Sequence, residues 1–319
     1  AARRAAAGAQ PAVEAVAASR GAGRLPPMAG PLLAVDAPSL LYRAWFALPD
    51  SIRGADGMPV NALLGATNAI LRVVADRAPR AVVICSGAEA ARYRVERYAG
   101  YHADRPPVPD GLAAQIARSG ELFEAFGWTL AGTAELEADD LLHSFAAAEV
   151  EAGGRALLMT GDRDMFQCAA PNVTVLYLRT GVRGVEEVTP AVVERRYGIP
   201  PALVPDFIAL RGDPSDGLPG ARGIGEKTAA DLLRRHGSLE GALAAAATAT
   251  GEKPRIAAAL REHADELRDF RAIATLQRVP VALPPDRPLD LGRGAAAAEA
   301  LGMRRLAARL RAAGDPARL

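Results

Sequence analysis

The sequence predicts an α/β fold, in which a mostly parallel sheet is flanked by helices and is followed by a helical unit. Short apolar runs alternate with helix-period segments through the first part of the chain, which is typical of parallel strands covered by helices. After about residue 190, short helical segments replace the apolar runs. We therefore expect a tail at 1–30, an α/β core at 31–189 and a helical unit at 190–319.

The first thirty residues are rich in alanine and dotted with arginine, and they contain few large apolar side chains. Such a segment cannot bury a core, so we expect a disordered tail. It also lacks the continuous leucine-like run of a secretory signal. Order is expected to begin near Pro31.

The expected strands are the five apolar runs of the core, which are LLAVDA (32–37), AVVICS (81–86), WTLAGT (128–133), ALLMTG (156–161) and VTVLYL (173–178). Helical periodicity marks the segments between most of them, at 61–77, 111–127 and 138–154. The same periodicity continues in the second unit, at 201–212, 226–237 and 255–276.

Composition limits the class of protein. The chain has 319 residues, of which 50% are hydrophobic and 24% charged, as in a soluble globular protein. A net charge of +1 leaves nucleic-acid binding open, because opposite charges can lie on different faces. Two cysteines suit a reducing cytosol, and four scattered histidines argue against zinc. No apolar run approaches the roughly 20 residues that span a bilayer.

Carboxylates follow several of the expected strands, where an open parallel sheet binds its ligands. The candidates are Asp36, Glu137, Asp139, Asp140, Asp162, Asp164, Asp213 and Asp216. Alone, Asp139 could simply favour a helix start, and Asp213 a turn before proline. Together the carboxylates would repel one another unless cations lay among them, and oxygen ligands suit Mg²⁺ or Mn²⁺. Two such ions about 4 Å apart assist in-line attack on a phosphodiester.

A glycine-rich stretch, GLPGARGIGEKTA (217–229), comes directly after the last two candidate acids. Exposed backbone N–H groups at a helix start favour an anion, so this stretch suits phosphate. It is not a P-loop, because Glu226 stands where the order G-K-[ST] would place Lys227. ATP is therefore not expected.

The segment RYRVERYAGYHADRPP (92–107) interleaves arginines with tyrosines. Arginine pairs with phosphates and tyrosine rings stack on unpaired bases, a combination that suits a single strand of nucleic acid. A solvated face with the tyrosines packed inward is an equally good interpretation of the composition.

Taken together, these segments resemble the 5′ nuclease family, which comprises the N-terminal domain of bacterial DNA polymerase I and the flap endonucleases. The blocks that carry the resemblance, in order, are LLAVDAPSLLYRAWFALP, YHADRPPVP, LEADDLL, TGDRDMFQ and GDPSDGLPGARGIGEKTAADLL, within about residues 31–285. The resemblance implies a free-standing, Mg²⁺-dependent, structure-selective 5′ nuclease that acts on DNA with a 5′ flap or 5′ end. It also implies a cytoplasmic, nucleoid-associated monomer that works beside a DNA polymerase or ligase in repair.

The resemblance further implies roles for individual residues. The first metal would be held by Asp36, Glu137, Asp139 and Asp140, and the second by Asp162, Asp164, Asp213 and Asp216. Residues 217–225 match a helix-hairpin-helix whose N–H groups grip duplex phosphates, often with a bound K⁺. The region near 92–120 would form an arch, in which Arg94 and His102 act on the attacked phosphate. Further DNA contacts are implied for Tyr42, Arg92, Tyr98, Arg105, Gly223, Gly225, Lys227 and Thr228.

Two positions depart from the family pattern. Ser86 or Gly87 stands where the family has another aspartate after the second strand, and His102 replaces a lysine. A histidine that is mostly neutral at pH 7 is a weaker partner for a phosphate. The alternative function is therefore a branched-DNA-binding protein with weak or lost nuclease activity. A small-RNA nuclease is a third possibility, against which the glycine hairpin argues.

Overall fold

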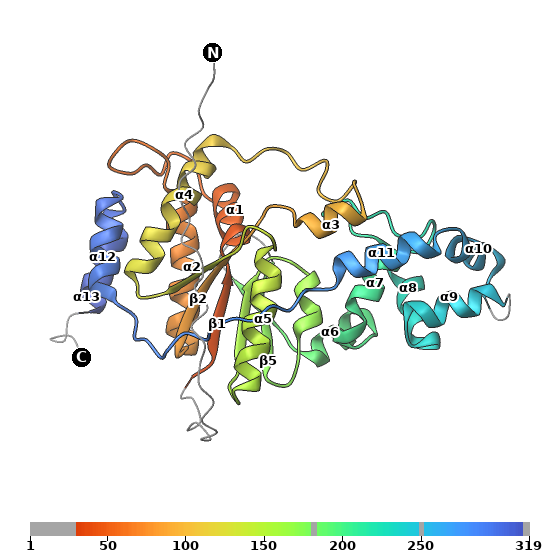
Figure 1. The fold of residues 1–319 in the computed structure, drawn as a ribbon. Helices are drawn as coiled ribbons and strands as arrows, with labels where there is room; N and C mark the ends of the chain where they lie inside the picture. The colour runs from red at the N-terminus through yellow and green to blue at the C-terminus, as the bar shows by residue number, and fades with distance from the viewer. Residues whose placement is uncertain (1–29, 180–183, 249–251, 315–319) are drawn as a thin grey trace, which may run out of the picture.

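The computed structural model describes residues 30–179, 184–248 and 252–314, and at its centre lies a six-stranded sheet (Figure 1). The strand order is β3-β2-β1-β4-β5-β6, in which only β6 runs antiparallel to its neighbour. The strands are β1 (Leu32–Asp36), β2 (Ala81–Ser86), β3 (Thr129–Gly132), β4 (Ala156–Thr160), β5 (Val173–Leu178) and β6 (Val185–Val188). The five expected strands and the mostly parallel sheet are confirmed.

Helices cover both faces of the sheet. On one face α1 (Ala37–Ala47), α2 (Asn61–Arg77) and α4 (Asp110–Ala125) share a core with Leu33 and Val35 of β1. On the other face α5 (Ala138–Glu151) packs on the alternate residues of β1. Both faces are therefore buried, which explains why the central strands read as continuous apolar runs.

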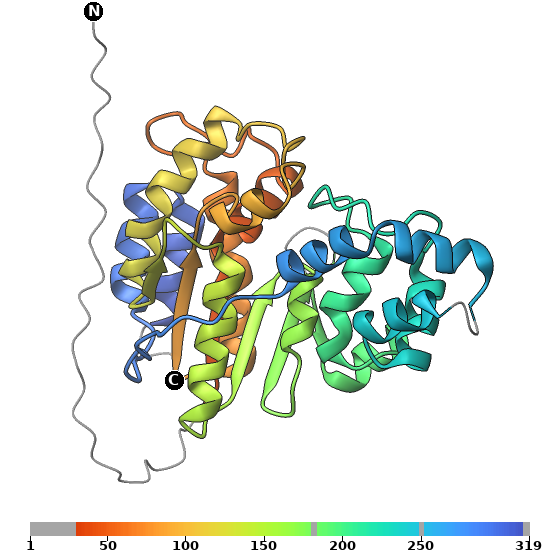
Figure 2. The ribbon, with the colours of Figure 1, turned by 45° about the vertical axis from the view of Figure 1, so that its right-hand side comes forward.

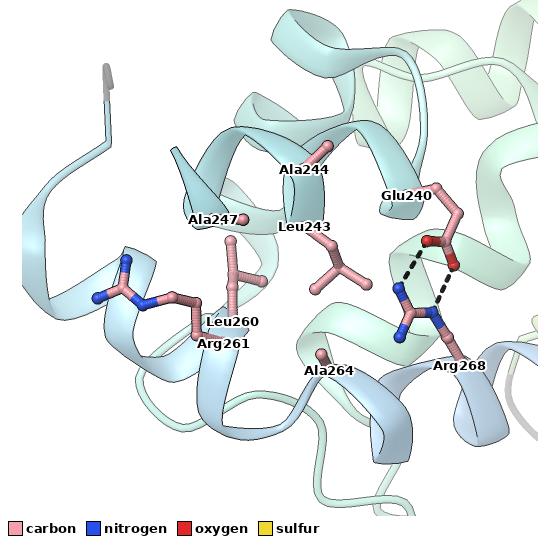
Figure 3. Close-up of a pocket in the computed structure, with 8 residues that line it drawn as sticks. All are labelled: Glu240, Leu243, Ala244, Ala247, Leu260, Arg261, Ala264 and Arg268. Carbon is pink, nitrogen blue, oxygen red and sulfur yellow. Dashed lines mark hydrogen bonds and ion pairs between the residues drawn. The ribbon is translucent and has the colours of Figure 1, made fainter. Parts of the chain in front are cut away.

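The second unit is helical and extends to one side of the sheet (Figure 2). It consists of α6 (Pro190–Tyr197), α7 (Val204–Arg211), α8 (Glu226–His236), α9 (Leu239–Ala247), α10 (Pro254–Glu262) and α11 (Ala264–Ala274). A hollow of about 280 Å³ lies between α9, α10 and α11, where Leu243 and Leu260 form its apolar floor (Figure 3). Arg268 pairs with Glu240 at its rim.

The last helices differ from expectation, because they pack on the α/β unit although their residues fall within 190–319. A strap, residues 275–290, runs back from α11 across the sheet unit (Figure 1). Buried Arg80 donates to the carbonyl oxygen of Pro284 at 2.8 Å and thereby holds the strap. Beyond it, α12 (Leu291–Ala300) and α13 (Arg304–Ala313) bury their apolar faces in the core of α1 and α2.

Several expectations concern single features. The expected disordered tail lies outside the described residues. Cys85 and Cys168 are both buried and free. Among the described helices, none is long and apolar enough to cross a membrane.

Candidate metal and DNA site

The acidic residues meet at the carboxyl edge of the sheet. Asp36 ends β1 and caps α1, accepting the backbone N–H of Ser39 at 3.0 Å and the hydroxyl of Thr160 at 2.7 Å. Asp162 and Asp164 follow β4, which pairs directly with β1. Asp139 lies in the first turn of α5. Adjacent parallel strands therefore bring carboxylates from distant parts of the chain to one place.

Burial and mutual repulsion perturb these carboxyl groups. Burial first, and then the charges of Asp216, Asp213 and Asp36, raise the pKa of Asp162 to about 7. Burial also raises the pKa of Asp164 well above its usual value, and Asp162 adds to this effect. For Asp139, burial again comes first, followed by repulsion from Asp36 and Asp162, and its pKa is well above the ordinary range. Without a cation the protein holds this cluster at an electrostatic cost.

Two oxygens of the cluster lack a partner. Among the described residues, Oδ1 of Asp139 and Oδ1 of Asp164 are buried without a hydrogen-bond donor. No three acidic, histidine or cysteine side chains of the described part are already arranged to hold one ion. Buried carboxylate oxygens without donors, in groups whose pKa is raised first by burial and then by their mutual repulsion, nevertheless fit a hard divalent cation. The donor chemistry of Asp36, Asp139, Asp162 and Asp164 therefore suits the expected metal.

Two of the other expected metal ligands are bound by protein groups. Glu137 accepts the N–H of Ala91 at 2.8 Å and the hydroxyl of Tyr101 at 3.0 Å, and it pairs with Arg94 at 2.7 Å. Asp140 pairs with Arg94 at 3.1 Å and accepts the N–H of Gln277 at 2.7 Å. The single charge of Arg94 thus offsets part of their combined negative charge, and neutral donors bind their other oxygens.

The last two expected ligands, Asp213 and Asp216, also have cationic neighbours. Asp213 lies 3.2 Å from Arg211. Asp216 contacts Nε2 of His102 at 3.1 Å and Arg105 at 3.2 Å. Asp213 and Asp216 still raise the pKa of Asp162 and Asp164, the two aspartates that follow β4. Both therefore lie beside the cluster.

The two residues expected to act on the phosphate are engaged inside the protein. The Arg94 side chain is only 4% exposed between its two carboxylates. His102 has a positive φ of 56°, and its Nδ1 lies 2.9 Å from the carbonyl oxygen of Glu89. Both ring nitrogens of His102 therefore lie within hydrogen-bond distance of protein oxygens, Nδ1 of the Glu89 carbonyl and Nε2 of the Asp216 carboxylate.

The segment that begins the expected arch divides between two environments. Arg92 of α3 (Arg92–Arg97) is exposed and pairs with Glu96 at 2.6 Å. Tyr98 packs edge-on against Phe270 with ring centroids 5.1 Å apart, and Tyr101 is buried. The tyrosines thus pack inward, as the alternative interpretation had it, while the arginine stays in solvent.

Tyr42 lies half-buried on α1 at the margin of the cluster. Burial raises its pKa, and the nearby Glu89 carboxylate adds to the rise while Arg105 opposes it. Phe46, one turn further along α1, is 74% exposed, and its ring centroid lies 6.5 Å from that of Tyr42. An aromatic surface therefore adjoins Arg105.

The glycine-rich stretch enters α8 as an open turn. Gly223 has a φ of 78°, a conformation that L side chains rarely adopt. Gly225 is the N-cap of α8 and has no other atom within 4 Å of the place where a Cβ would lie. Lys227 is exposed and Thr228 half-buried in the first turn. The N–H groups here have no side-chain cap and can take an anion.

Ser86 and Gly87 are the two candidate positions for the aspartate that the family has after its second strand, and their surroundings differ. Ser86 is exposed at the end of β2, and its hydroxyl lies against Gly132 of β3. A Cβ at Gly87 would lie 2.5 Å from the carbonyl oxygen of Leu136 and 2.6 Å from the N–H nitrogen of Ala138. Only position 86 can therefore accept a carboxylate without moving the backbone.

One functional contact escaped the sequence interpretation. Arg43 of α1 donates to the carbonyl oxygen of Gly161 at 2.5 Å, and its charge lowers the pKa of Asp36 against the larger effect of burial. The signal was present in the sequence, since Arg43 lies two helical turns beyond Asp36 and so on the same face of α1.

The fold and the site define a class of protein: an α/β sheet with a carboxylate cluster at its carboxyl edge, beside a helix start that can bind anions. A family model described as 5′-3′ exonuclease, N-terminal resolvase-like domain matches residues 31–198. A second, described as 5′-3′ exonuclease, C-terminal SAM fold, matches residues 199–291. The chain belongs to the 5′-3′ exonuclease family.

Relatives agree with this membership, and a solved structure agrees with the fold. A 5′-3′ exonuclease of Streptomyces coelicolor is 38% identical over 289 residues, which cover 85% of this chain and 94% of the relative. DNA polymerase I of Mycobacterium bovis is 38% identical over 257 residues, covering 80% of this chain but only 28% of the polymerase. The bacteriophage T5 D15 flap endonuclease, solved with DNA and metal ions, has a TM-score of 0.61 at 16% identity, covering 88% of this chain and 98% of that chain. This last likeness supports the fold.

Proposed function

We propose that the chain is a divalent-metal-dependent, structure-selective 5′ nuclease that hydrolyses DNA at a 5′ flap or 5′ end. The observation that carries the proposal is the cluster of carboxylates with unpartnered buried oxygens at Asp139 and Asp164. Family membership supports hydrolysis from the 5′ side, and the DNA and metal ions in the T5 flap endonuclease structure support the substrate and the cofactor.

The proposed chemistry depends on what the cluster holds. Asp36, Asp139, Asp162 and Asp164 would bind Mg²⁺ or Mn²⁺, and Asp213 and Asp216 lie close enough to add charge. A divalent cation there supplies neutralisation of the attacked phosphodiester and acidification of the attacking water. Because the aspartates repel one another until a cation binds, the site is prepared for a double positive charge.

The substrate is proposed to span both units. Gly223, Gly225 and Lys227 at the start of α8 would hold phosphates of duplex DNA, with K⁺ as a candidate ion in this turn. Exposed Arg92 and Arg105, with Tyr42, would border the unpaired strand. The glycine turn belongs to the same ordered stretch as Asp213 and Asp216. A duplex bound at this turn would therefore lie at a fixed distance from the carboxylate cluster.

The setting of this activity is proposed from the relatives. Similarity to DNA polymerase I supports a role beside a DNA polymerase or ligase in replication and repair. Such a role would place the protein at the nucleoid in the cytoplasm.

A second candidate function is a branched-DNA-binding protein with weak or lost nuclease activity. It is favoured by the lack of an acid at Ser86 and Gly87 and by the engagement of His102 with Asp216. In that case the turn at α8 would still bind duplex DNA.

Cleavage of a labelled 5′-flap duplex distinguishes these functions. The wild-type protein is expected to release the flap in Mg²⁺ or Mn²⁺ and not in EDTA. The exposed Asp50 provides a matched control, so Asp50→Asn should cleave like the wild type. Flap binding without cleavage in either metal would favour the binding protein instead.

A further inference from the structure

Gln167 lies in the short helix η1 (Asp164–Cys168), which follows β4 and begins with Asp164 of the carboxylate cluster. Its side-chain nitrogen donates to the carbonyl oxygen of Asp164 at 2.8 Å and to that of Ala274, the last residue of α11, at 2.9 Å. Its side-chain oxygen accepts the N–H of Leu276 at 3.2 Å. One amide group therefore uses both of its N–H donors and its oxygen to join the acidic loop to the start of the strap.

The same part of the strap also binds α5, the other element that carries acids of the cluster. The N–H of Gln277 donates to Oδ1 of Asp140 at 2.7 Å, and the N–H of Val279 donates to Oγ of Ser144 at 3.0 Å. The hydroxyl of Ser144 donates in turn to the carbonyl oxygen of Asp140 at 2.6 Å. The junction of α11 and the strap, residues 274–279, thus contacts both η1 and α5.

The helix that leads into this junction is held within the helical unit. Arg271 of α11 pairs with the buried Asp206 of α7, whose other carboxylate oxygen accepts the N–H of Leu239 at the start of α9 at 2.9 Å. One residue earlier, Phe270 packs against the ring of Tyr98. The end of α11 is therefore a fixed point to which the acidic loop can be tied.

Asp164 depends on such an anchor because its surroundings oppose its charge. Burial first, and then repulsion by Asp162, Asp216 and Asp213, raise its pKa well above the usual value. Its buried Oδ1 has no hydrogen-bond donor among the described residues, so no protein group holds this oxygen. Its backbone is held instead, since Asp162 accepts the N–H at 2.8 Å and Gln167 binds the carbonyl oxygen.

We infer that Gln167 is a positioning residue that holds Asp164 in the carboxylate cluster by tying its loop to the junction of α11 and the strap. The inference deepens the proposed function and rests on it for the presence of a divalent cation. Gln167 would act through Asp164, because its own amide is engaged by backbone groups. Loss of a partner that orients a metal ligand typically lowers metal affinity or activity by about 10-fold to 100-fold.

Two substitutions remove the same three hydrogen bonds and differ in the volume that they leave. Gln167→Met keeps the length of the side chain, whereas Gln167→Ala does not. Both variants should bind Mn²⁺ at least about tenfold more weakly than the wild type. Bound Mn²⁺ is counted without DNA from the loss of the free-ion signal in electron paramagnetic resonance, at a temperature where every protein is folded. Wild-type affinity in Gln167→Met would overturn the inference, whatever the affinity of Gln167→Ala.

Two control variants separate positioning from other effects. Gln277→Met removes an exposed amide from the same junction but keeps the backbone N–H that binds Asp140, so it should bind Mn²⁺ like the wild type. Val73→Ala opens a cavity in the core on the α2 face of the sheet, so it should lower the unfolding temperature without changing Mn²⁺ affinity. If Val73→Ala weakened Mn²⁺ binding as much as Gln167→Met, general destabilisation would explain both results and the inference would fail.

Flap cleavage gives a second measurement that a purely structural role would not produce. Gln167→Met should lower kcat at least about tenfold and leave KM for the flap duplex within about twofold, because the glycine turn at α8 is unchanged. A rise in KM at unchanged kcat would assign Gln167 to DNA binding and overturn the inference.

The outcome stands apart from the test of the proposed function. Weaker Mn²⁺ binding in both Gln167 variants of a protein that does not cleave flaps would uphold the role of Gln167 and contradict the nuclease. Metal-dependent flap cleavage, together with unchanged Mn²⁺ affinity in Gln167→Met, would do the reverse. A wild-type protein that binds no Mn²⁺ at millimolar concentration would overturn both.

Discussion

The charge of Asp162 should destabilise the metal-free protein, so its removal should stabilise it. In the wild type, Oδ1 of Asp162 accepts the backbone N–H of Asp164 at 2.8 Å. Asp162→Asn deletes the charge and keeps a side-chain oxygen that can still accept this N–H. The substitution therefore changes electrostatics with little change in geometry. Its effect on stability is opposite in sign to that of most substitutions of a buried residue.

The magnitude follows from the shifted pKa. Burial, and then the charge of Asp216, raise the pKa of Asp162 from 3.8 to about 7. A rise of roughly three pKa units corresponds to about 4 kcal/mol of unfolding free energy above the higher pKa. Asp162 retains some contact with solvent, so screening reduces the effect and we expect a gain of about 2 to 4 kcal/mol.

The sign of the pH dependence is fixed by the direction of the shift. Because the folded protein holds the proton more tightly than the unfolded chain, the wild type loses stability as pH rises from about 4 to about 7. Above that range the loss is complete. The advantage of Asp162→Asn should therefore be small near pH 4 and full at pH 8.

Urea unfolding in EDTA at pH 4.5 and pH 8, followed by circular dichroism, measures this difference. Asp50→Asn, at an exposed position, is the matched control and should match the wild type at both pH values. Addition of Mn²⁺ at pH 8 should stabilise the wild type more than the variant. If Asp162→Asn were less stable than the wild type in EDTA at pH 8, the repulsion within the cluster would be refuted.

Three further predictions concern binding and turnover. Gly225→Val should weaken duplex binding about tenfold in a fluorescence anisotropy titration, because it places a side chain over the open turn of α8 without an internal clash. Unchanged affinity for the duplex would contradict a role of this turn in phosphate binding. Asp164→Asn should lower flap cleavage at least about a hundredfold while flap binding persists, and cleavage at the wild-type rate would exclude Asp164 from the metal site. Ser86→Asp should shift the Mg²⁺ dependence of cleavage to lower concentration, whereas Gly87→Asp should reduce thermal stability by collision with the 136–138 backbone.

The sheet and the positions of the acids could be predicted from the sequence. A strand buried on both faces must be apolar along its length, and β1, β2, β4 and β5 satisfy this requirement. Asp36 ends one such strand and Asp162 follows another, so their meeting at one edge needs only the parallel topology. By contrast β6 contains Glu186 and Glu187, and a short polar strand at a sheet edge gives no such pattern.

The partners of the acids could not be predicted, because they come from distant parts of the chain. Arg94 reaches Asp140 from 46 positions away, and Gln277 reaches it from 137 positions away. Nothing in the local sequence of LEADD distinguishes Asp140, whose Oδ1 accepts protein donors, from Asp139, whose buried Oδ1 has none among the described residues. The attachment of α12 and α13 to the α/β unit was equally hidden, since their short apolar faces of small residues and leucine would fit either unit.

Single-turnover cleavage of a 5′-labelled flap duplex across a Mg²⁺ titration tests the central claim most directly, namely that the carboxylate cluster holds divalent cations that drive hydrolysis. The account predicts no product in EDTA, a rate that rises more steeply than the first power of Mg²⁺ concentration, and a loss of that rise in Asp164→Asn. Cleavage in EDTA at the rate seen in Mg²⁺, or an unchanged Mg²⁺ dependence in Asp164→Asn, would contradict it.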